Sequence, residues 1–279
     1  MKIIMFQGGL GNQLFEYVYY KYLMSKFPNE KIYGFYYSRW LKAHNGLEIS
    51  KWFDVTLPPS TSFTHSVAFL LFIFARLFYK LGIRPPFINY KFERNDSAFF
   101  QEGFWQDKEF IEEVGMPEIK HNIELDEYNT GLLKMIISGN SISIHVRRGD
   151  YLTPENKAIF GNICTTDYYK ECIEKAKQSF ENPVFLIFSN DIEYSKTLFA
   201  PEDKCVFVDG NQGEKSFFDL YLMAHCKGMI LANSTFSCWA AYLNKRAQMV
   251  MSPSRWVNKG IEPNVNLGTW TCVEIPQLN

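Results

Sequence analysis

The second half of the chain alternates short apolar runs with helical patterns, and this alternation restricts the fold more than any other feature. Apolar runs typical of β-strands fall at 142–146, 184–188, 205–208, 229–232 and 248–251. Helical patterns separate most of them, at 167–180, 216–226 and 236–243. Strands that alternate with helices form βαβ units, so we predict an α/β domain built on a parallel sheet.

Each of the first four apolar runs is followed by a polar cluster. The clusters lie at 145–150, 189–191, 209–211 and 233–237. Since the carboxyl ends of parallel strands meet at one edge of the sheet, we expect these clusters to lie together. The sequence therefore predicts a ligand site at that edge.

Two adjacent arginines, Arg147 and Arg148, stand in the first of these clusters. A guanidinium is permanently charged and binds phosphate oxygens in pairs, so the cluster favours a phosphorylated ligand. The segment 233–237 precedes a helical pattern, which Ser234 or Thr235 can cap. The free N–H groups at such a helix start bind phosphate, and with Arg147 they would hold a diphosphate from two sides. A surface Arg–Asp pair and a plain helix cap are the alternatives.

Three other polar residues each allow two explanations. Asp219 lies within an apolar helical pattern, where its carboxylate can accept two hydrogen bonds from a guanine base or face solvent. Asp191 either orients the loop after its strand or caps the next helix. His145 either contacts a nucleotide or substrate from the strand end, or is a core histidine whose hydrogen bonds are satisfied internally.

The first half of the chain is clear only near its start. A strand, a glycine-rich turn, a helix and a second strand are predicted at 2–6, 8–11, 12–25 and 32–35. The turn lets a backbone approach a ligand at Gly9, and Asn12 and Gln13 offer amide groups beside it. A tight strand-to-helix turn capped by Asn12 is the alternative. Leu14 replaces the third glycine of a dinucleotide fingerprint, and residues 38–135 show no assignable pattern.

Composition excludes several classes of function. The net charge is -1, which gives no electrostatic basis for nucleic acid as the main partner. The six cysteines form no C-x-x-C pair and fall largely in apolar segments, so we expect reduced, buried thiols of a cytosolic protein. Neither a D-x-D motif nor a His/Cys/Asp set at metal-ligand spacing occurs, so no metal cofactor is expected.

An apolar segment at 66–81 is the stretch most similar to a membrane span. It is shorter than the ~20 residues that a span needs, and Arg76 interrupts it. We expect a buried or partner-facing helix there. Peripheral membrane contact is the alternative, because Arg76 and Lys80 could extend their charges to a lipid surface. Since the N-terminus shows no signal peptide, the expected location is the cytoplasm or the inner face of the membrane.

Five segments carry more specific motifs. They are FQGGLGNQLF at 6–15, GFWQ at 103–106, HVRRGDY at 145–151, FSND at 188–191 and LANSTFSCWAA at 231–241. In this order they resemble the α-1,2-fucosyltransferases of glycosyltransferase family eleven, whose three motifs are similar to the last three segments. The resemblance extends over nearly the whole chain except residues 38–100.

The resemblance implies a GT-B architecture, in which two Rossmann-like domains face a cleft and the parallel sheet is clearest in the C-terminal half. Residues 1–138 would form the acceptor-side domain, and residues 139–279 the GDP-fucose-binding domain. It also implies an inverting, metal-independent transfer of L-fucose from GDP-fucose to the 2-hydroxyl of a terminal galactose. The partners would then be GDP-fucose and a β-galactoside, and the α-1,2-linked product would be a bacterial surface polysaccharide.

The resemblance also implies roles for residues of this chain. Arg147 would neutralise the departing phosphate, Asp150 would accept the proton of the acceptor hydroxyl, and His145 would assist. Arg148 would be structural and paired with a nearby carboxylate. The residues expected to bind the donor are Gly9, Asn12, Gln13, Arg147, Asn190, Asp191, Asp219, Asn233, Ser234, Thr235, Phe236 and Ser237, and those expected to bind the acceptor are Trp105 and Gln106.

Two positions depart from the family pattern. Cys238 stands where the family usually has a tryptophan, and Gly228 where a histidine or similar residue is common. Either change could alter the packing of the last strand–helix unit. If Cys238 faces the cleft, it could also alter acceptor preference.

Three alternative functions stay open. The first is a GDP-fucose transferase that makes another linkage or modifies a protein, since donor motifs are shared broadly. The second is a non-catalytic module that binds a nucleotide sugar or a glycan. The third is a nicotinamide oxidoreductase, which the incomplete glycine fingerprint disfavours.

Overall fold

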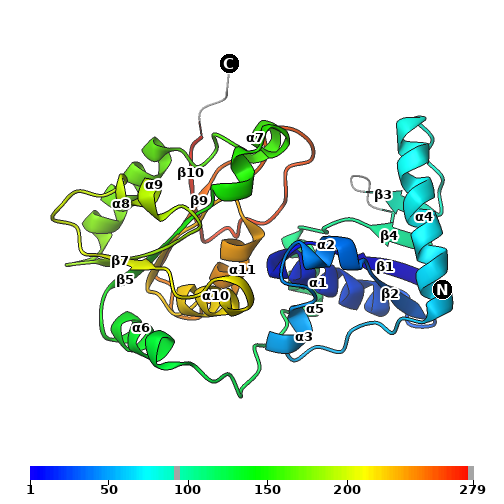
Figure 1. Ribbon diagram of the computed structural model, residues 1–279, viewed down its shortest axis with the longest axis horizontal. Coiled ribbons are helices and arrows are strands. Elements are labelled where there is room, and N and C mark those ends of the chain that lie inside the picture. The colour runs from blue at the N-terminus through cyan, green and yellow to red at the C-terminus, as the bar shows by residue number, and fades with distance from the viewer. Residues whose placement is uncertain (91–94, 276–279) are drawn as a thin grey trace. The chain divides into compact units, whose positions relative to one another are not determined.

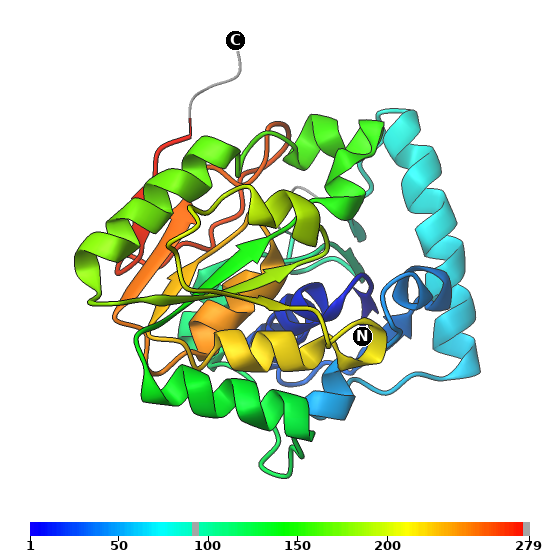
Figure 2. The same ribbon diagram turned by 60° about the vertical axis from the view of Figure 1, so that its left-hand side comes forward.

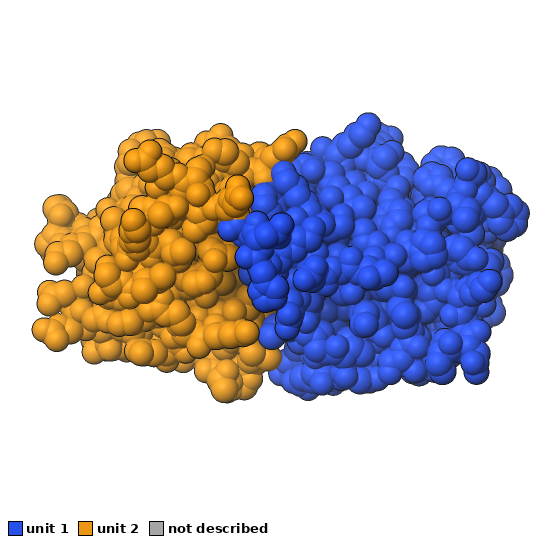
Figure 3. Space-filling view, turned by 90° about the horizontal axis from the view of Figure 1, so that it is seen from below, with its two compact units in different colours: residues 1–123 blue, residues 124–279 orange. Residues whose placement is uncertain are grey.

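The computed structural model of the chain describes residues 1–90 and 95–275 (Figure 1). It contains two compact units, residues 1–123 and residues 124–279 (Figure 3). Each unit contains one sheet, and every pair of neighbouring strands in the described residues is parallel. The predicted α/β class is therefore confirmed for both units.

The division between the units precedes helix α6 (Glu127–Ser138). The sequence suggests a division at 138/139, which would leave this helix in the first unit. Instead α6 buries Leu132 and Ile136 in the second unit, where the Ser141 hydroxyl donates to the Ile136 carbonyl at 3.0 Å. The helix thus leads directly into the first strand of the second sheet.

The first unit is built on a four-stranded sheet. Its elements, in chain order, are β1 (Lys2–Phe6), α1 (Leu10–Lys26), β2 (Ile32–Tyr36), α2 (Ser38–Lys42), α3 (Ile49–Trp52), α4 (Ser62–Lys80), β3 (Ile88–Tyr90), β4 (Phe100–Glu102) and α5 (Lys108–Val114). The strands lie in the order β2-β1-β4-β3. The strand order therefore reverses between β1 and β4, and open parallel sheets bind ligands at such a reversal.

Helix α4 covers one face of this sheet. Its Ala68 and Phe72 pack with Ile3 and Met5 of β1. Because successive residues of a strand point to opposite faces, Ile4 between them faces the other side. Helix α1 packs against β1 and is covered by α3 and α5, so nearly all of its first four turns are buried.

The second unit is built on a six-stranded sheet. After α6 its elements are β5 (Ser141–Val146), a 3-10 helix η1 (Gly149–Leu152), α7 (Pro154–Phe160), α8 (Thr166–Ser179), β6 (Val184–Ser189), α9 (Ile192–Lys196), β7 (Cys205–Val208), a 3-10 helix η2 (Gly213–Lys215), α10 (Phe217–Met223), β8 (Gly228–Ile230), α11 (Thr235–Leu243), β9 (Met249–Pro253) and β10 (Thr271–Val273). The strand order is β10-β9-β8-β5-β6-β7. This is the doubly wound order of nucleotide-binding sheets, with its reversal between β5 and β8.

Helices cover both faces of the second sheet (Figure 2). Ile142 and Ile144 of β5 pack with Tyr169 and Cys172 of α8. The alternate residue His145 faces the opposite side, where its ring lies 5.8 Å from that of Phe236 in α11. The strand therefore presents apolar groups to α8 and polar groups to the layer of α10 and α11.

The predicted strands and helices of the second half are confirmed within a few residues, whereas β10, α7 and α9 carried no recognised signal. The segment 38–135, in which only the helix at 66–81 is expected from sequence, contains α2 to α5, most of α6, β3 and β4. Several of these elements are only three to five residues long, too short to display a hydrophobic period. All six cysteines are free, but only Cys172, Cys226 and Cys238 are buried, whereas Cys164 and Cys205 are partly buried and Cys272 is exposed.

Candidate functional site

Two of the predicted polar clusters flank the strand reversal in the second sheet. Residues 147–150 follow β5, and residues 233–237 follow β8, which is the neighbour of β5. The clusters after β6 and β7 lie at the same edge, because all four strands are parallel. The prediction that polar residues gather at one sheet edge is confirmed.

Arg148 has the structural role that the sequence predicts. Its Nε donates to Asp191 Oδ2 at 2.9 Å, and its guanidinium lies 3.8 Å from the ring centroid of Tyr194. Its backbone N–H donates to Asn190 Oδ1 at 3.0 Å. Arg148 therefore anchors the loop after β5 to the loop after β6.

Arg147 lies in the same loop, and its side chain is partly exposed. Its guanidinium carbon lies 5.8 Å from the ring centroid of Tyr151. The Tyr151 hydroxyl donates to the Asn233 carbonyl at 2.9 Å, which ties the loop after β5 to the segment after β8. These contacts hold Arg147 at the strand reversal, while its contact with a phosphate stays a prediction.

Asn190 and Asp191, two of the predicted donor-binding residues, serve the architecture of the loops. The side-chain oxygen Oδ1 of Asn190 accepts from the backbone N–H of Arg148. Asp191 caps helix α9 by accepting from the Tyr194 N–H at 3.0 Å and also forms the ion pair with Arg148. The capping alternative for Asp191 is thus confirmed, and its carboxylate acts by positioning the arginine loop.

The segment after β8 divides into anchoring residues and residues at the start of α11. The Asn233 side chain is buried and donates to the carbonyls of Phe160 and Trp256 at 3.1 and 3.0 Å. The Ser237 hydroxyl is buried and faces backbone carbonyls of its own turn. These two side chains hold the segment in place, and their expected contact with the donor stays a prediction.

The start of α11 keeps its backbone donors available. Ser234 occupies the N-cap position, but its side chain forms no capping hydrogen bond. Thr235 and Phe236 are partly exposed in the first turn. Because the first N–H groups of a helix have no partners within it and lie at the positive end of its dipole, this start suits an anionic group.

His145 is buried near the reversal, with 6% of its surface exposed. Burial, together with the positive charge of Arg147 as the smaller cause, lowers the pKa of His145 to about 3. Its Nδ1 has no hydrogen-bond partner among the described residues. The side chain is therefore neutral at physiological pH, and its contact with a nucleotide or substrate stays a prediction.

Asp219 lies in the first turn of α10, at the same sheet edge. Its Oδ1 accepts from Asn211 Nδ2 at 2.9 Å, and Asn211 also forms a reciprocal amide pair with Asn129 of α6 at 2.7 and 3.0 Å. Burial raises the pKa of Asp219 to about 7, although the hydrogen bond from Asn211 opposes this shift. The hydrogen bond from Asn211 therefore holds the Asp219 carboxyl in one orientation. At neutral pH this carboxyl is close to its midpoint of ionisation.

Asn129 has no counterpart in the sequence prediction, because it lies in the segment without an assignable pattern. The pattern Asp126-x-x-Asn129 is the signal that was available. Asp126 caps α6 by accepting from the Asn129 N–H at 2.9 Å. That cap predicts the helix start, but the pairing with Asn211 depends on the tertiary fold.

Two predictions concern features that the structure leaves untested. The backbone of Asp150, the predicted base, lies in η1, but its side chain is outside the described residues. Among the described side chains, no group of three or more His, Cys, Asp or Glu residues is arranged to hold a metal ion. Both the base and the absence of a metal requirement stay predictions.

Gln13 in the first unit has a structural role. Its side chain is buried, and its Nε2 donates to the carbonyls of Gly8 and Gly46 at 3.0 and 2.9 Å. Its Oε1 accepts from the N–H groups of Glu48 and Ile49 at 2.9 and 3.1 Å. All hydrogen-bonding positions of the amide are thus occupied by backbone, and the expected contact of Gln13 with the donor stays a prediction.

Asn12 and Gln106 meet at the strand reversal of the first sheet. Asn12 follows β1 and Gln106 follows β4, and Gln106 Nε2 donates to Asn12 Oδ1 at 3.1 Å. Gly9 precedes them, and a Cβ atom there would make only ordinary contact with His44, at 3.7 Å. Packing therefore does not require a glycine at position 9. The structure thus brings together residues that the sequence assigned separately to the donor and acceptor.

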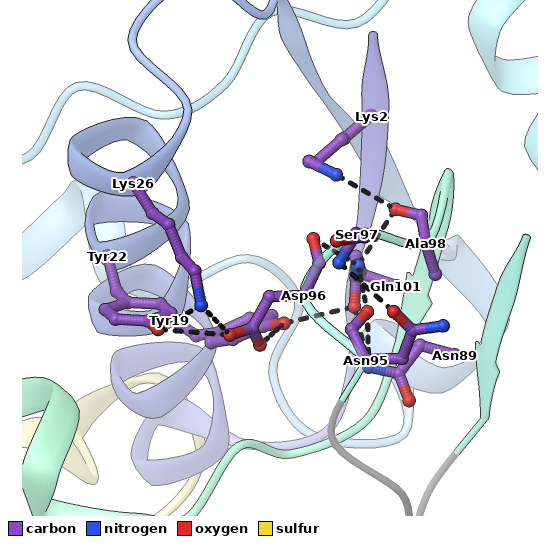
Figure 4. A network of polar contacts seen from close by, with 10 residues as sticks. All are labelled: Lys2, Tyr19, Tyr22, Lys26, Asn89, Asn95, Asp96, Ser97, Ala98 and Gln101. Carbon is purple, nitrogen blue, oxygen red and sulfur yellow. Dashed lines mark hydrogen bonds and ion pairs between the residues drawn. The ribbon is translucent and has the colours of Figure 1, made fainter.

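Trp105 is held in place by a polar network. Its ring stacks on that of Tyr19 at 4.0 Å between centroids, and its backbone has a positive φ of 50°. The Tyr19 hydroxyl donates to Asp96 Oδ1 at 3.0 Å, and Asp96 also accepts from Lys26 at 2.8 Å (Figure 4). The network fixes Asp96, before β4, to Tyr19 and Lys26 of helix α1. Because Trp105 stacks on Tyr19, the network also sets the position of Trp105.

The two departures from the family pattern lie inside the second unit. Cys238 is fully buried in α11. It therefore contributes to packing, and a contact with an acceptor would require it to be exposed. Gly228 begins β8, and a Cβ atom there would lie 2.5 Å from Ile142 Cδ1.

Replacing Gly228 with alanine is therefore expected to destabilise the protein by about 1–3 kcal/mol, because overpacking forces core side chains from their rotamers. Gly131 is the matched control, since a Cβ atom at this position in α6 meets nothing within 4 Å. Gly131→Ala should stabilise the helix by about 0.5–1 kcal/mol. Urea unfolding of both variants measures the difference, and equal midpoints would contradict the packing explanation.

Comparisons with known proteins agree with the motifs. The model of glycosyl transferase family 11 matches residues 83–274, which is most of the chain.

An alpha-1,2-colitosyltransferase of Escherichia coli is 36% identical over 169 residues, which cover 56% of this chain and 56% of that protein. The O-antigen biosynthesis glycosyltransferase WbnK of Escherichia coli is 32% identical over 134 residues, covering 48% and 44%. A galactoside alpha-(1,2)-fucosyltransferase 1 of Saimiri sciureus is 32% identical over 103 residues, covering 37% and 28%. The matches thus span about half, or less, of the length of these relatives.

The fold is similar to that of solved fucosyltransferases. The crystal structure of fucosyltransferase NodZ from Bradyrhizobium aligns with a TM-score of 0.52 over 89% of this chain and 94% of its own, at 14% identity. The NodZ alpha-1,6-fucosyltransferase co-crystallized with GDP aligns with a TM-score of 0.51, at 14% identity and over 89% and 93% of the two chains. At this identity the likeness concerns the fold alone, and it agrees with the expected GT-B class.

Proposed function

The chain belongs to glycosyl transferase family 11, and we propose that it transfers L-fucose from GDP-fucose to the 2-hydroxyl of a terminal galactose. The observation that carries this proposal is the presence of Arg147 and the uncapped start of α11 on the two sides of one strand reversal. A permanent cation and a helix N-terminus suit the two phosphates of a nucleotide sugar. Two relatives with α-1,2 linkages in their names support the linkage.

Arg147 acts on the departing nucleotide. As the bond between fucose and phosphate breaks, negative charge accumulates on the β-phosphate oxygen. A cation fixed beside that oxygen binds the transition state more tightly than the ground state and so accelerates the reaction. The loop contacts of Arg148 and Tyr151 hold this cation in place before the reaction begins.

His145 contributes as a neutral imidazole. Because its pKa lies far below physiological pH, it carries no charge and can offer a hydrogen bond from the strand end. Asp150 is the proposed base for the acceptor hydroxyl, and Trp105 with Gln106 is the proposed acceptor contact. These roles complete the inverting reaction without a metal, since Arg147 and backbone N–H groups neutralise the leaving group.

Asp219 recognises the guanine base in this proposal. The N1–H and N2–H groups of guanine are two donors on one edge, and an ionised carboxylate accepts both. Asn211 occupies one lone pair of Oδ1 and fixes the carboxylate plane, while Asn129 fixes Asn211. The side chain that recognises the base is thus held in place by residues of the second unit.

Donor binding is expected to strengthen as the pH rises through about 7, the pKa of Asp219. Below this pH the neutral carboxyl must itself donate a hydrogen, whereas above it the carboxylate accepts from both guanine donors. The KM for GDP-fucose should therefore fall between about pH 6 and about pH 8. GDP-fucose is the right probe because the terminal phosphate of GDP titrates near about 6. A flat profile would show that guanine is recognised elsewhere.

The direct test incubates the protein with GDP-fucose and a panel of β-galactosides, followed by linkage analysis of the products by NMR. An α-1,2-linked fucoside formed equally in EDTA supports the whole proposal. Activity that stops in EDTA and returns with manganese would overturn the metal-free mechanism. Another linkage, or a fucosylated protein, would overturn the assigned acceptor, and GDP binding without transfer would indicate a binding module.

A second donor deserves a parallel assay. The Escherichia coli relative at 36% identity is named an alpha-1,2-colitosyltransferase, so transfer of colitose is the competing proposal. Competition between the two nucleotide sugars decides it by their ratio of kcat/KM. The name of WbnK supports a role in bacterial surface polysaccharide, which we propose for this chain on the cytoplasmic face of the membrane.

A further inference from the structure

Helix α4 presents a large apolar surface to solvent. It is the one helix among the described residues that is long and apolar enough to span a membrane by length and composition, yet only 22% of that stretch is buried. The exposed apolar side chains that follow helical spacing are Phe63 (71% exposed), Leu70 (55%), Ile73 (47%), Phe74 (45%), Leu77 (48%) and Leu81 (62%). We call these six residues the outer face of α4. A helix apolar on both sides in water indicates a missing partner.

The opposite side of α4 is fixed to the protein. Ala68, Phe72 and Ala75 belong to the core of the first sheet. Arg76 forms an ion pair with the buried Glu102 of β4 at 2.9 Å, and its guanidinium lies 3.4 Å from the centroid of the Phe72 ring. The helix is therefore bound to the sheet along its length, which is inconsistent with spanning a membrane and favours lying on its surface.

The formal charges on α4 and on the segments that adjoin it in the chain are all of one sign. The sequence contains no Asp or Glu between residues 55 and 92. Lys80 is exposed and follows Leu77 by three residues and Ile73 by seven, so it borders the outer face. Arg84 is also exposed, just beyond the helix, and stacks over Tyr79 at 4.8 Å. Apolar side chains beside exposed cations match a bilayer with anionic head groups.

We propose that the outer face of α4 docks the protein onto an anionic phospholipid bilayer, with the helix lying parallel to the surface. The apolar side chains enter the boundary between head groups and acyl chains, and Lys80 and Arg84 contact anionic head groups. A second copy of the chain is a poorer occupant, because it would bring the same cations and no opposite charge. This inference goes beyond the transfer reaction and does not depend on it.

The test is co-sedimentation of the protein with vesicles of phosphatidylcholine alone or mixed with phosphatidylglycerol. The wild-type protein should bind the anionic vesicles more strongly and should be released by raised salt. Leu70→Gln with Leu77→Gln should weaken binding by about 100-fold, and Lys80→Gln with Arg84→Gln by about 10–30-fold on anionic vesicles only. Ile137→Gln with Ile261→Gln is the matched control, since these two side chains are 51% and 59% exposed elsewhere.

Other outcomes overturn the proposal. If the wild-type protein binds neither kind of vesicle, the outer face does not contact lipid. If it forms a dimer in sedimentation equilibrium that Leu70→Gln with Leu77→Gln abolishes, without vesicle binding, the occupant is a second copy. Equal weakening by the control pair would mean that binding is not specific to α4. Circular dichroism of each variant confirms that the fold is retained, as expected for exposed positions.

Discussion

Replacing Arg147 with lysine is expected to reduce kcat for fucosyl transfer by a factor of about 10²–10³, the usual effect of removing one transition-state donor. Lysine retains the charge but loses the planar fork that grips two phosphate oxygens. The loss should fall on kcat more than on the KM for GDP-fucose, because charge on the leaving phosphate develops only as the bond breaks. Steady-state kinetics with a β-galactoside acceptor measures both quantities.

Arg148→Lys is the control, since it makes the same change one residue away. The lysine can keep an ion pair with Asp191 and loses the stacking on Tyr194. We expect a modest loss of stability and a fall in kcat well below that of Arg147→Lys. If the two variants lose equal activity, the loop geometry matters and the specific contact of Arg147 does not. Unchanged kinetics for Arg147→Lys would remove that residue from the mechanism.

Replacing Asp219 with asparagine is expected to raise the KM for GDP-fucose by about 10–100-fold, because two hydrogen bonds to a charged acceptor are lost. An asparagine amide offers one acceptor and one donor, so it cannot satisfy both guanine donors. The preference for GDP over ADP as an inhibitor should fall by a similar factor. The kcat at saturating donor should change little, since Asp219 does not contact the reacting atoms in this proposal.

The same variant should be more stable than the wild-type protein at high pH. Burial raises the pKa of Asp219 above its value in the unfolded chain, so the folded state favours the neutral carboxyl. The stabilisation is present below the unfolded pKa and is lost as the pH rises through about 7. Urea unfolding should therefore show Asp219→Asn to be more stable than wild type at about pH 8, but not at about pH 4.

Asn129→Ala separates positioning from recognition. It removes the partner of Asn211 while leaving Asp219 in place. We expect a smaller rise in the donor KM and a shift in its pH profile, since the orientation of the Asp219 carboxyl is loosened. An Asn129→Ala variant with unchanged pH dependence would show that the amide pair serves stability alone.

The sequence predicted those parts of the site that depend on residues close together in the chain. A strand that ends in Arg147 and a helix that starts after Ser234 are defined by hydrophobic periodicity and by the residues at the element ends. Parallel pairing then brings strand ends to one edge, so the gathering of the polar clusters followed without knowledge of the contacts. The structural role expected for Arg148 is also confirmed by its ion pair with Asp191.

The roles of single amides were beyond prediction because their partners are remote in sequence. Gln13 is saturated by carbonyl and N–H groups at positions 46, 48 and 49 as well as Gly8. Asn129 and Asn211 lie 82 positions apart. An amide side chain can donate and accept in any setting. Whether it binds a ligand or the backbone therefore depends on which groups the fold brings beside it.

The order of residues in the chain determined the parallel sheet of the second unit, its polar edge and the family, because periodicity and strand-end motifs act over short distances. Tertiary structure decided which face of α4 is exposed, which amides are already occupied, and that Asp219 is buried enough to titrate near neutral pH. These properties depend on the solvent and partners that surround a group after folding. An apolar segment such as 66–81 is the same in sequence whether the protein covers one side of it or both.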